Sequence, residues 1–386
     1  MKPNALLLSS AFLMAGVALQ AQTATKLTKP DATFPEPFTQ VSSLRELPNG
    51  KVIVADMRDK VVQLLDLSTG TLVKVGREGQ GPGEYALPAE LIGMPNGETW
   101  VNDIMGRRFL SIDATGKPGR TITLPGSGSG GIAFAGRGAG ADAAGNLYLQ
   151  ASPFNLSGPT ASSPDSLAIH RWKPGQASFD TVAWFVGPRA SIQSSGGANN
   201  RAVQVRVGTG KVFAPQESWG VASDGSIARV IPSPYRVIWH PPASNKGVAG
   251  PVQPYTPIKV TSADHDEEME RRKRATPMMV TVGGPGRAGA GAPSLPALTA
   301  EDFEPTKPPF TGQAAVLVAP DGEVWVRRTG PAKQPELTYD VFDRTGKLAR
   351  KVSMSRDRQV VGFGKGAVYV VRTDDDDLQH LERFAR

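Results

Sequence analysis

Short apolar segments alternate with polar, glycine-containing turns along the chain, and the alternation repeats. Residues 47–70 and 94–116 share one pattern, offset by 47 residues: Pro-Asn-Gly, an apolar strand, Asp, a basic turn, a second strand and a second Asp. The turn and the strand after it recur around Gly50, Gly97, Gly145, Gly225, Gly322 and Gly366. The segments after these turns, such as 52–55 and 368–371, are apolar at successive positions, as in strands buried on both faces. A period in the forties with several strands per repeat predicts a β-propeller.

Six repeats predict an all-β fold, a six-bladed β-propeller. The last repeat contains only three strand-like segments, so its fourth strand has to come from elsewhere in the chain. Thr23 to Leu27 precede the first repeat, and we expect them to complete the last blade as its outer strand. Closure of this kind would pair strand edges that otherwise invite aggregation.

Two intervals between repeats, of 80 and 97 residues, are longer than the others and indicate insertions. The first insertion includes residues 194–208. The second, residues 261–310, lies between the fourth and fifth blades and joins a helix to a Gly/Pro-rich, low-complexity loop. Both lengthen a crossing from the outer strand of one blade to the inner strand of the next, so both are expected on the face that carries VGREGQGPGEY. Long connections on one rim are where a scaffold usually carries its function.

The helix of the second insertion is predicted from its capping and its charge spacing. Thr261 and Asp264 fit a capping box. Acidic residues precede basic ones by one helical turn in the pairs Glu267–Arg271, Glu268–Arg272 and Glu270–Arg274. Since Met269 is almost its only apolar residue, one interpretation is a solvated surface helix. The alternative is a lid over the channel mouth, hinged by residues 283–291.

The glycine-rich segment VGREGQGPGEY (residues 75–85) is predicted to turn between two blades rather than to wrap a phosphate. A phosphate loop needs Gly-Lys followed by Ser or Thr and then a helix. The residues that follow Gly-Lys here are Val52, Pro118, Val212, Leu348 and Gly366. Residues 284–289 match G-x-G-x-x-G, but prolines follow where a dinucleotide site needs a helix. No nucleotide cofactor is predicted.

The first 21 residues combine Lys2, a short apolar run and small residues, which predicts a signal peptide followed by a propeller from residue 22 to 386. We therefore expect a periplasmic or secreted monomer without a membrane span in the mature chain. The sequence has no cysteine, which excludes disulfides and thiolate chemistry. The formal charge is +7, but basic residues are scattered among acidic ones, so no nucleic-acid partner is predicted.

Several segments carry a resemblance to a known family. GREGQGPGEY, FAPQESWGVASDG, PSPYRVIW and PYTPIKVTSAD resemble segments of exported bacterial six-bladed propellers of the NHL-repeat or Tol-like type. The similarity covers essentially the mature chain and implies the same fold. It implies no single activity, because such propellers include lyases, lactonases and binding modules.

Motifs that would mark an enzyme are missing from the sequence. No serine lies in G-x-S-x-G, the four histidines are isolated, and Asp374 to Asp377 lack calcium-loop spacing and are predicted to form a solvated turn. No catalytic residue, metal site or cofactor is assigned. Two functions stay open. One is a non-enzymatic binding or scaffold module for a protein, peptide or glycan. The other is a metal-dependent lactonase or lyase, with carboxylates such as Asp103 and Glu217 as candidates.

The ligand-binding residues are expected on the loop-rich face. Clustered Arg, Tyr and Trp side chains suit the recognition of an acidic group, a sugar or a peptide. The predicted binding residues are Arg77, Glu84, Tyr85, Arg107, Arg108, Gln216, Glu217, Trp219, Tyr235 and Arg236.

Overall fold

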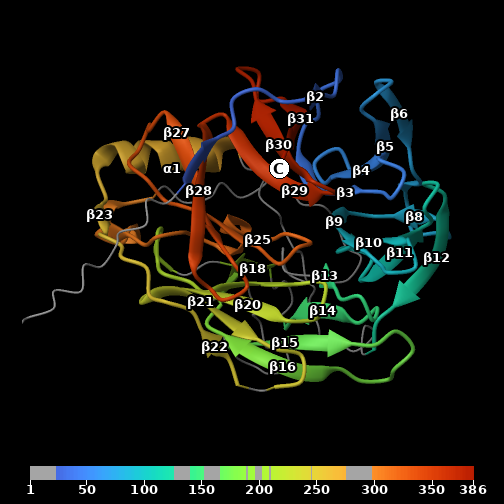
Figure 1. Cartoon of the computed structure of the whole chain (residues 1–386), viewed down its shortest axis with the longest axis horizontal. Helices are drawn as coiled ribbons and strands as arrows, with labels where there is room; N and C mark the ends of the chain where they lie inside the picture. The colour runs from blue at the N-terminus through green and yellow to red at the C-terminus, as the bar shows by residue number, and fades with distance from the viewer. Residues whose placement is uncertain are drawn as a thin grey trace, which may run out of the picture.

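The chain forms a six-bladed β-propeller, as its repeats predict. The computed structural model describes residues 23–125, 140–151, 166–187, 190–195, 202–207, 210–244, 246–274 and 298–386. Figure 1 shows the blades following one another around the molecule in chain order, from blue to red. Within each blade, neighbouring strands along the chain pair antiparallel.

Blades 1 to 3 each contain four consecutive strands. Blade 1 consists of β3 (Val41–Glu46), β4 (Val52–Asp56), β5 (Val61–Asp66) and β6 (Thr71–Lys74). Blade 2 consists of β9 (Pro88–Gly93), β10 (Thr99–Asp103), β11 (Arg108–Ile112) and β12 (Pro118–Thr123). Blade 3 consists of β13 (Gly140–Ala141), β14 (Leu147–Gln150), β15 (Leu167–Trp172) and β16 (Asp180–Phe185).

Blades 4 to 6 follow the same order. Blade 4 consists of β19 (Ser218–Val221), β20 (Ile227–Pro232), β21 (Tyr235–His240) and β22 (Val248–Ala249). Blade 5 consists of β25 (Val316–Val318), β26 (Val324–Arg327), β27 (Glu336–Phe342) and β28 (Leu348–Ser355). Blade 6 contains β29 (Arg358–Gly364), β30 (Ala367–Thr373) and β31 (Gln379–Ala385), and its fourth strand is β2 (Ala32–Thr33).

The N-terminal segment pairs with two blades. The prediction that Thr23 to Leu27 complete blade 6 is wrong. β1 (Thr23–Lys26) pairs parallel with β28 and adds a fifth strand to blade 5. The strand that completes blade 6 is β2, which pairs antiparallel with β31. The two short segments are equally strand-like in sequence. Which of them reaches blade 6 is decided by Phe34 and Phe38, which are buried between blades 6 and 1.

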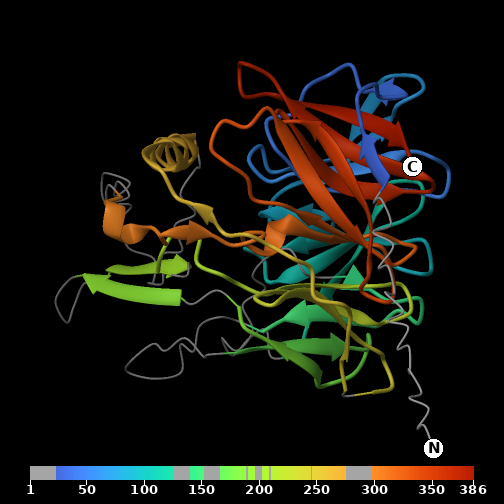
Figure 2. The ribbon, with the colours of Figure 1, turned by 60° about the vertical axis from the view of Figure 1, so that its left-hand side comes forward.

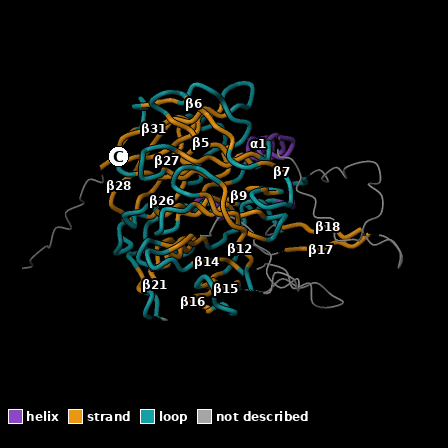
Figure 3. Tube along the Cα trace, turned by 90° about the vertical axis from the view of Figure 1, so that its right-hand side faces the viewer, coloured by secondary structure: helices purple, strands orange, loops and turns teal. Residues whose placement is uncertain are grey.

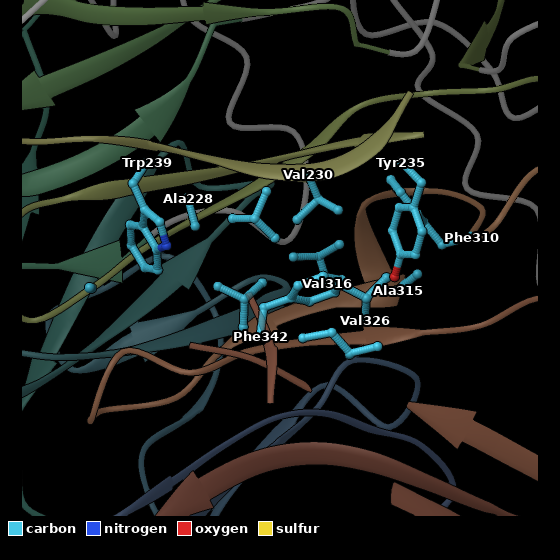
Figure 4. Close-up of a cluster of buried hydrophobic side chains, with 13 residues drawn as sticks. Ala228, Val230, Tyr235, Trp239, Phe310, Ala315, Val316, Val326 and Phe342 are labelled. Carbon is cyan, nitrogen blue, oxygen red and sulfur yellow. The ribbon is translucent and has the colours of Figure 1, made fainter. Parts of the chain in front are cut away.

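The second strand of each blade is deeply buried because adjacent blades pack on both of its faces. Every residue of β4 and β10 is buried, as the continuous apolar runs predict. Figure 4 shows one of the clusters between blades, in which Val230 and Trp239 of blade 4 face Val326 and Phe342 of blade 5. Such side-chain packing between sheets joins one blade to the next, together with side-chain hydrogen bonds such as that from the Tyr369 hydroxyl of blade 6 to Glu46 of blade 1 (2.6 Å).

The remaining elements lie in the crossings between blades. β7 (Arg77–Glu78) and β8 (Glu84–Tyr85) pair parallel in the first crossing. β17 (Ala190–Ser195) and β18 (Ala202–Val207) form a hairpin in the crossing from blade 3 to blade 4. The crossing from blade 4 to blade 5 contains β23 (Ile258–Lys259), α1 (Ser262–Arg274), η1 (Ala300–Asp302), β24 (Thr306–Lys307) and η2 (Gln313–Ala315).

Both insertions project on the same side of the propeller. Figures 2 and 3 show the β17–β18 hairpin and α1 standing off the sheets on that side. Residues 1–22, 196–201 and 275–297 lie outside the described residues, so the predicted signal peptide, the G-x-G-x-x-G segment and the predicted hinge do too. Within the described residues, no helix has the length and apolar character needed to span a membrane.

Candidate functional site

The strand order places two sets of connections on one face of the propeller. Because the strands of a blade alternate in direction, the crossings between blades and the loops between the second and third strands lie at the same end of the sheets. We call this end the loop face. It includes the crossings 75–87, 186–217 and 250–315, which hold the glycine-rich segment and both insertions.

The glycine-rich segment turns a corner, and Tyr85 holds it. The Tyr85 side chain is 1% exposed, and its hydroxyl donates to the Val75 carbonyl (3.0 Å) and accepts from the Val62 N–H (2.9 Å). Gly76 has φ +69°, and a Cβ there would lie 2.9 Å from the Gly83 carbonyl oxygen. The glycine is therefore required by backbone conformation and by close packing. Tyr85 is a core residue and not, as predicted, a ligand-binding one.

Most charged residues of this corner pair with one another. Arg77 and Glu84 form an ion pair at 2.7 Å. Arg108 pairs with the buried Asp103 (3.1 Å) and also donates to the backbone carbonyls of the corner, among them that of Gln80 (2.8 Å). Arg107 is exposed, in a left-handed turn with φ +51°. Of the five residues predicted here, Arg107 and the largely exposed Arg77 extend into solvent, whereas Glu84 and Arg108 hold the loop.

An aspartate ends the second strand of blades 1 and 2, and its hydrogen bonds explain why the repeat contains it. Asp103 accepts hydrogen bonds from the backbone N–H groups of Leu87, in the crossing, and Gly106, in the following loop. Asp56 accepts from the Gln40 N–H and from the loop that follows it. Burial raises the pKa of Asp56, although these hydrogen bonds act in the opposite direction. Both carboxylates tie two connections of the loop face together.

The second group of predicted residues meets between blades 3 and 4. Glu217 forms an ion pair with Arg229 (2.6 Å) and accepts from the Val186 N–H (3.1 Å). Trp219 is 1% exposed, and its indole N–H donates to Gln150 (3.4 Å), so it packs in the core instead of binding a ligand as predicted. Gln216 is half-buried and precedes Glu217 in the chain.

Arg236 lies beside Arg229 on the face of blade 4 that is turned toward blade 3. The β20–β21 register sets Arg229 opposite Ile238 and Arg236 opposite Ile231, so the two arginines are diagonal neighbours on one face. The Arg229 guanidinium lies 3.4 Å from Nε2 of His240, on the same face. Burial, and then Arg229, lower the pKa of His240, so its ring is neutral at pH 7. We call Glu217, Arg229, Arg236 and His240 the blade 3–4 cluster.

Sequence reasoning missed two members of this cluster, Arg229 and His240. Arg229 interrupts the apolar strand Ile227–Pro232, and a charged residue at a buried strand position is a signal that could have identified it. His240 gave no such signal because it ends a strand.

Tyr235, also predicted to bind a ligand, lies on the opposite face of its strand from Arg236 and points toward blade 5. Its hydroxyl donates to Asp340 of blade 5 (3.0 Å). The Arg328 guanidinium lies between the rings of Tyr235 and Tyr255, at 5.0 and 4.9 Å from their centroids, and pairs with Asp340. Burial, and then the Asp340 carboxylate, raise the pKa of Tyr235 well above its usual value. Adjacent strand positions point to opposite faces, which is why Tyr235 and Arg236 separate.

The helix α1 is a surface helix, as one of the two interpretations predicts, and one side of it packs against the rest of the protein. Asp264 and Lys307 are both buried and form an ion pair, and the Lys307 ammonium also donates to the Gly330 carbonyl (2.6 Å). His265 stacks on Phe303, with ring centroids 4.0 Å apart. The predicted capping box forms in part: Asp264 accepts from the backbone N–H of Thr261, but the Thr261 hydroxyl also donates to Asp264, and the Asp264 N–H donates to the Thr261 carbonyl (3.1 Å).

The predicted ion pairs along α1 form only in part. Glu268 pairs with Arg272 as expected (3.0 Å) and also with Arg271 (2.6 Å). Glu267 pairs with Arg356, at the end of blade 5, and not with Arg271. The side chain of Arg274, in the third predicted pair, lies outside the described residues.

Acid is expected to loosen α1. Burial alone would raise the pKa of Glu268, but Arg271 and Arg272 outweigh it and hold this pKa below its usual value, about 4.3 in model peptides. A lowered pKa in the folded state means that the stabilisation is present above the usual value and is lost as the pH falls through the folded value. Because both partners of Glu268 lie in α1 itself, we expect the helix to lose internal stabilisation and gain mobility as the pH falls below about 4.3, whereas Glu268→Gln should make this transition shallower.

A fluorescent label on α1 can measure this gain in mobility. The chain has no cysteine, so the exposed position of Asp266 can carry a single Asp266→Cys substitution and a fluorophore, whose anisotropy is followed across the pH range. The Glu268→Gln variant with the same label is the control. Identical transitions in the two proteins would show that Glu268 does not hold the helix.

Asp374 accepts hydrogen bonds within the loop that it begins, as expected for a turn. Asp374 accepts from the N–H groups of Asp376 and Leu378 and lies 2.7 Å from Nε2 of His380. Among the described residues, no three His, Asp or Glu side chains are grouped so that they could share a metal ion. A hollow of about 740 Å³ lies between blades 2 and 3 and contains none of the predicted binding residues. Its lining includes Arg120, Ile122, Trp172 and Gln176.

The chain is similar to solved structures of low sequence identity. No family model matches the chain, and no curated protein does. A protein described as exported, from Bacteroides fragilis, is 11% identical, with 95% of each chain covered and a TM-score of 0.46. A calcium-binding regucalcin from Agrobacterium tumefaciens is 11% identical over 95% of this chain and 98% of its own (TM-score 0.43). A gluconolactonase from Xanthomonas campestris is 9% identical over 91% of each chain (TM-score 0.44).

Proposed function

We propose that this protein is an exported, non-enzymatic binding module that holds a protein, peptide or glycan on its loop face. Export is inferred from the composition of residues 1–21. The blade 3–4 cluster is the observation that supports the binding site. It contains half-buried charged groups that arise from different strands, beside the crossing that carries the β17–β18 hairpin.

The charged groups of the cluster suit a ligand better than those of the glycine-rich corner do. In the corner, Arg108 and Glu84 each bond to neighbouring backbone and hold the turn. In the cluster, Arg229 pairs with the carboxylate of Glu217, and the buried Nε atoms of Arg229 and Arg236 have no hydrogen-bond partner among the described residues. Arginine presents several donors in a fixed plane and is favoured where carboxylate or phosphate groups are recognised. We infer that the ligand carries an acidic group.

We propose that the second insertion is a fixed wall of this face rather than a moving lid. The buried Asp264–Lys307 pair and the contact of His265 with Phe303 hold α1 in place. A buried ion pair is costly to separate, which opposes repeated opening. A wall of this kind restricts the directions from which a ligand can approach.

The alternative, a metal-dependent lactonase or lyase, has one observation in its favour. Asn102 is 1% exposed, its amide N–H donates to Glu90 (2.7 Å), and its carbonyl oxygen has no hydrogen-bond partner among the described residues. Carboxamide and carboxylate oxygens are ligands for calcium. One such pair falls short of a complete ligand set. A thermal melt that is unchanged by chelator would count against this alternative, because a bound ion stabilises the native state.

The proposed function is tested with defined ligands and two arginine variants. Thermal shift is measured with acidic and neutral tripeptides and with acidic and neutral oligosaccharides. We expect acidic members to raise Tm and Arg236→Gln to reduce the effect. Arg344→Gln, in the loop between the last two strands of blade 5 and so on the opposite face, should leave it unchanged. The proposal fails if no member of the panel raises Tm, or if only Arg344→Gln reduces the effect.

A further inference from the structure

We infer that the blade 3–4 cluster binds an oxyanion, a carboxylate, phosphate or sulfate group, on the Nε–H groups of Arg229 and Arg236. This inference rests on the proposed function and specifies the chemical group by which the ligand is held. The geometry of four side chains between two blades supports it.

Two buried donors of the cluster have no hydrogen-bond partner in the described part of the chain. Among the described residues, five buried side-chain polar atoms lack a hydrogen-bond partner: Asn102 Oδ1, Arg229 Nε, Arg236 Nε, Asp264 Oδ1 and Asp340 Oδ1. Three are oxygens in three separate places, and the Asp264 oxygen still has its ion pair with Lys307. The two nitrogens are both guanidinium donors and both belong to this cluster. A buried donor of a charged group that lacks an acceptor is costly, so a shared acceptor between them would be stabilising.

The two arginine side chains lie on the same face of blade 4. Arg229 and Arg236 are diagonal neighbours on paired strands, within reach of one another for long side chains. Ile231 and Ile238 separate them on the sheet and provide an apolar floor. Each guanidinium presents Nε–H and a terminal N–H along one edge, an arrangement that matches two oxygens of one anion.

The cluster carries a net positive charge. Glu217 neutralises Arg229, and the His240 ring is neutral at pH 7, so Arg236 is left with an uncompensated charge. The ionisable groups that blade 3 turns toward blade 4 are already engaged: Arg171 pairs with Asp180 (3.2 Å), and the Tyr148 hydroxyl donates to Asp142 (2.9 Å). The described part of blade 3 therefore supplies no carboxylate to Arg236, and an external anion would.

Oxyanion binding can be measured directly on the mature protein. Thermal shift is recorded with sodium phosphate, sodium sulfate and sodium acetate, each against sodium chloride at matched ionic strength. A saturable rise in Tm with phosphate or sulfate is expected for a tetrahedral group, and a rise with acetate for a carboxylate. Arg236→Gln should weaken binding by about tenfold or more, because charge-assisted hydrogen bonds are lost. Arg58→Gln, exposed in the loop between β4 and β5 on the same face, is the matched control and should bind as the wild type does.

A second variant tests the site without removing an arginine. Glu217→Gln keeps an acceptor for the Val186 N–H but removes the competing carboxylate, so oxyanion affinity should rise several-fold. The inference is overturned if no salt exceeds chloride, or if folded Arg236→Gln and Glu217→Gln both bind as the wild type does. Such a result would mean that water, and not an anion, accepts from the Nε–H groups of Arg229 and Arg236. If an oxyanion binds but no member of the peptide and oligosaccharide panel raises Tm, the proposed function is rejected and the oxyanion site is retained.

Discussion

Replacing Phe34 with alanine is expected to lower the free energy of unfolding by about 3–5 kcal/mol, as for other buried phenylalanines. Phe34 is fully buried and its ring lies 5.9 Å from that of Phe38. Its backbone N–H donates to the Leu381 carbonyl of blade 6, while its side chain packs against blade 1. The substitution would leave a cavity where the first and last blades meet. Urea unfolding followed by tryptophan fluorescence measures the loss.

The control for this prediction is Val73→Ala. Val73 is 60% exposed on β6, the outer strand of blade 1, and its truncation should change stability by no more than about 0.5 kcal/mol. If Phe34→Ala unfolds at the same urea concentration as Val73→Ala, the N-terminal segment does not hold the ring together. A loss confined to Phe34→Ala would show that it does.

Replacing Lys307 with methionine is expected to release α1 and to destabilise the protein by about 3–5 kcal/mol, the usual cost of leaving a buried charge unpaired. Burial would raise the pKa of Asp264, but Lys307 and Thr261 hold it below its usual value, so the carboxylate is ionised at neutral pH. Without the ammonium group, this charge stays buried or draws water into the interface. Hydrogen exchange of residues 262–274 should lose protection before the blades do.

Two further variants decide whether the ion pair is responsible. Lys259→Met removes an exposed lysine from β23, the strand paired with that of Lys307, and should leave protection of α1 unchanged. Asp264→Asn combined with Lys307→Met removes both charges while asparagine can still accept from the Thr261 N–H. This double variant should recover most of the loss, since a neutral pair has no unpaired charge. Full protection in Lys307→Met alone would show that other contacts hold the helix.

The fold could be predicted further than the site. Gly50, Gly97 and the later turn glycines occur at intervals that count the blades, and uniform burial of β4 and β10 follows from their apolar runs. Closure was predicted with the wrong strand, because Thr23–Lys26 and Ala32–Thr33 are both short and weakly patterned. Strand pairing across more than 300 residues depends on packing that local periodicity does not contain.

The aromatic residues predicted to bind a ligand lie in the core of the protein. Tyr85, Trp219 and Tyr235 were chosen by residue type, and all three are buried with a hydrogen-bonded polar group. Tyrosine and tryptophan serve interfaces and cores equally well, since both combine a large apolar surface with one polar atom. Arg229 was not chosen, yet it links Glu217 to His240.

By itself, the sequence determined the number of blades, the burial of their second strands and the positions of the insertions. These follow from local patterns, since burial on two faces demands an apolar run and tight turns demand glycine. Only the tertiary structure decided that β2 completes blade 6 and that Lys307 anchors α1. It also brought Arg229 and Arg236 together beside Glu217. Contacts of this kind depend on which faces of separate sheets meet, and that is settled by packing between blades.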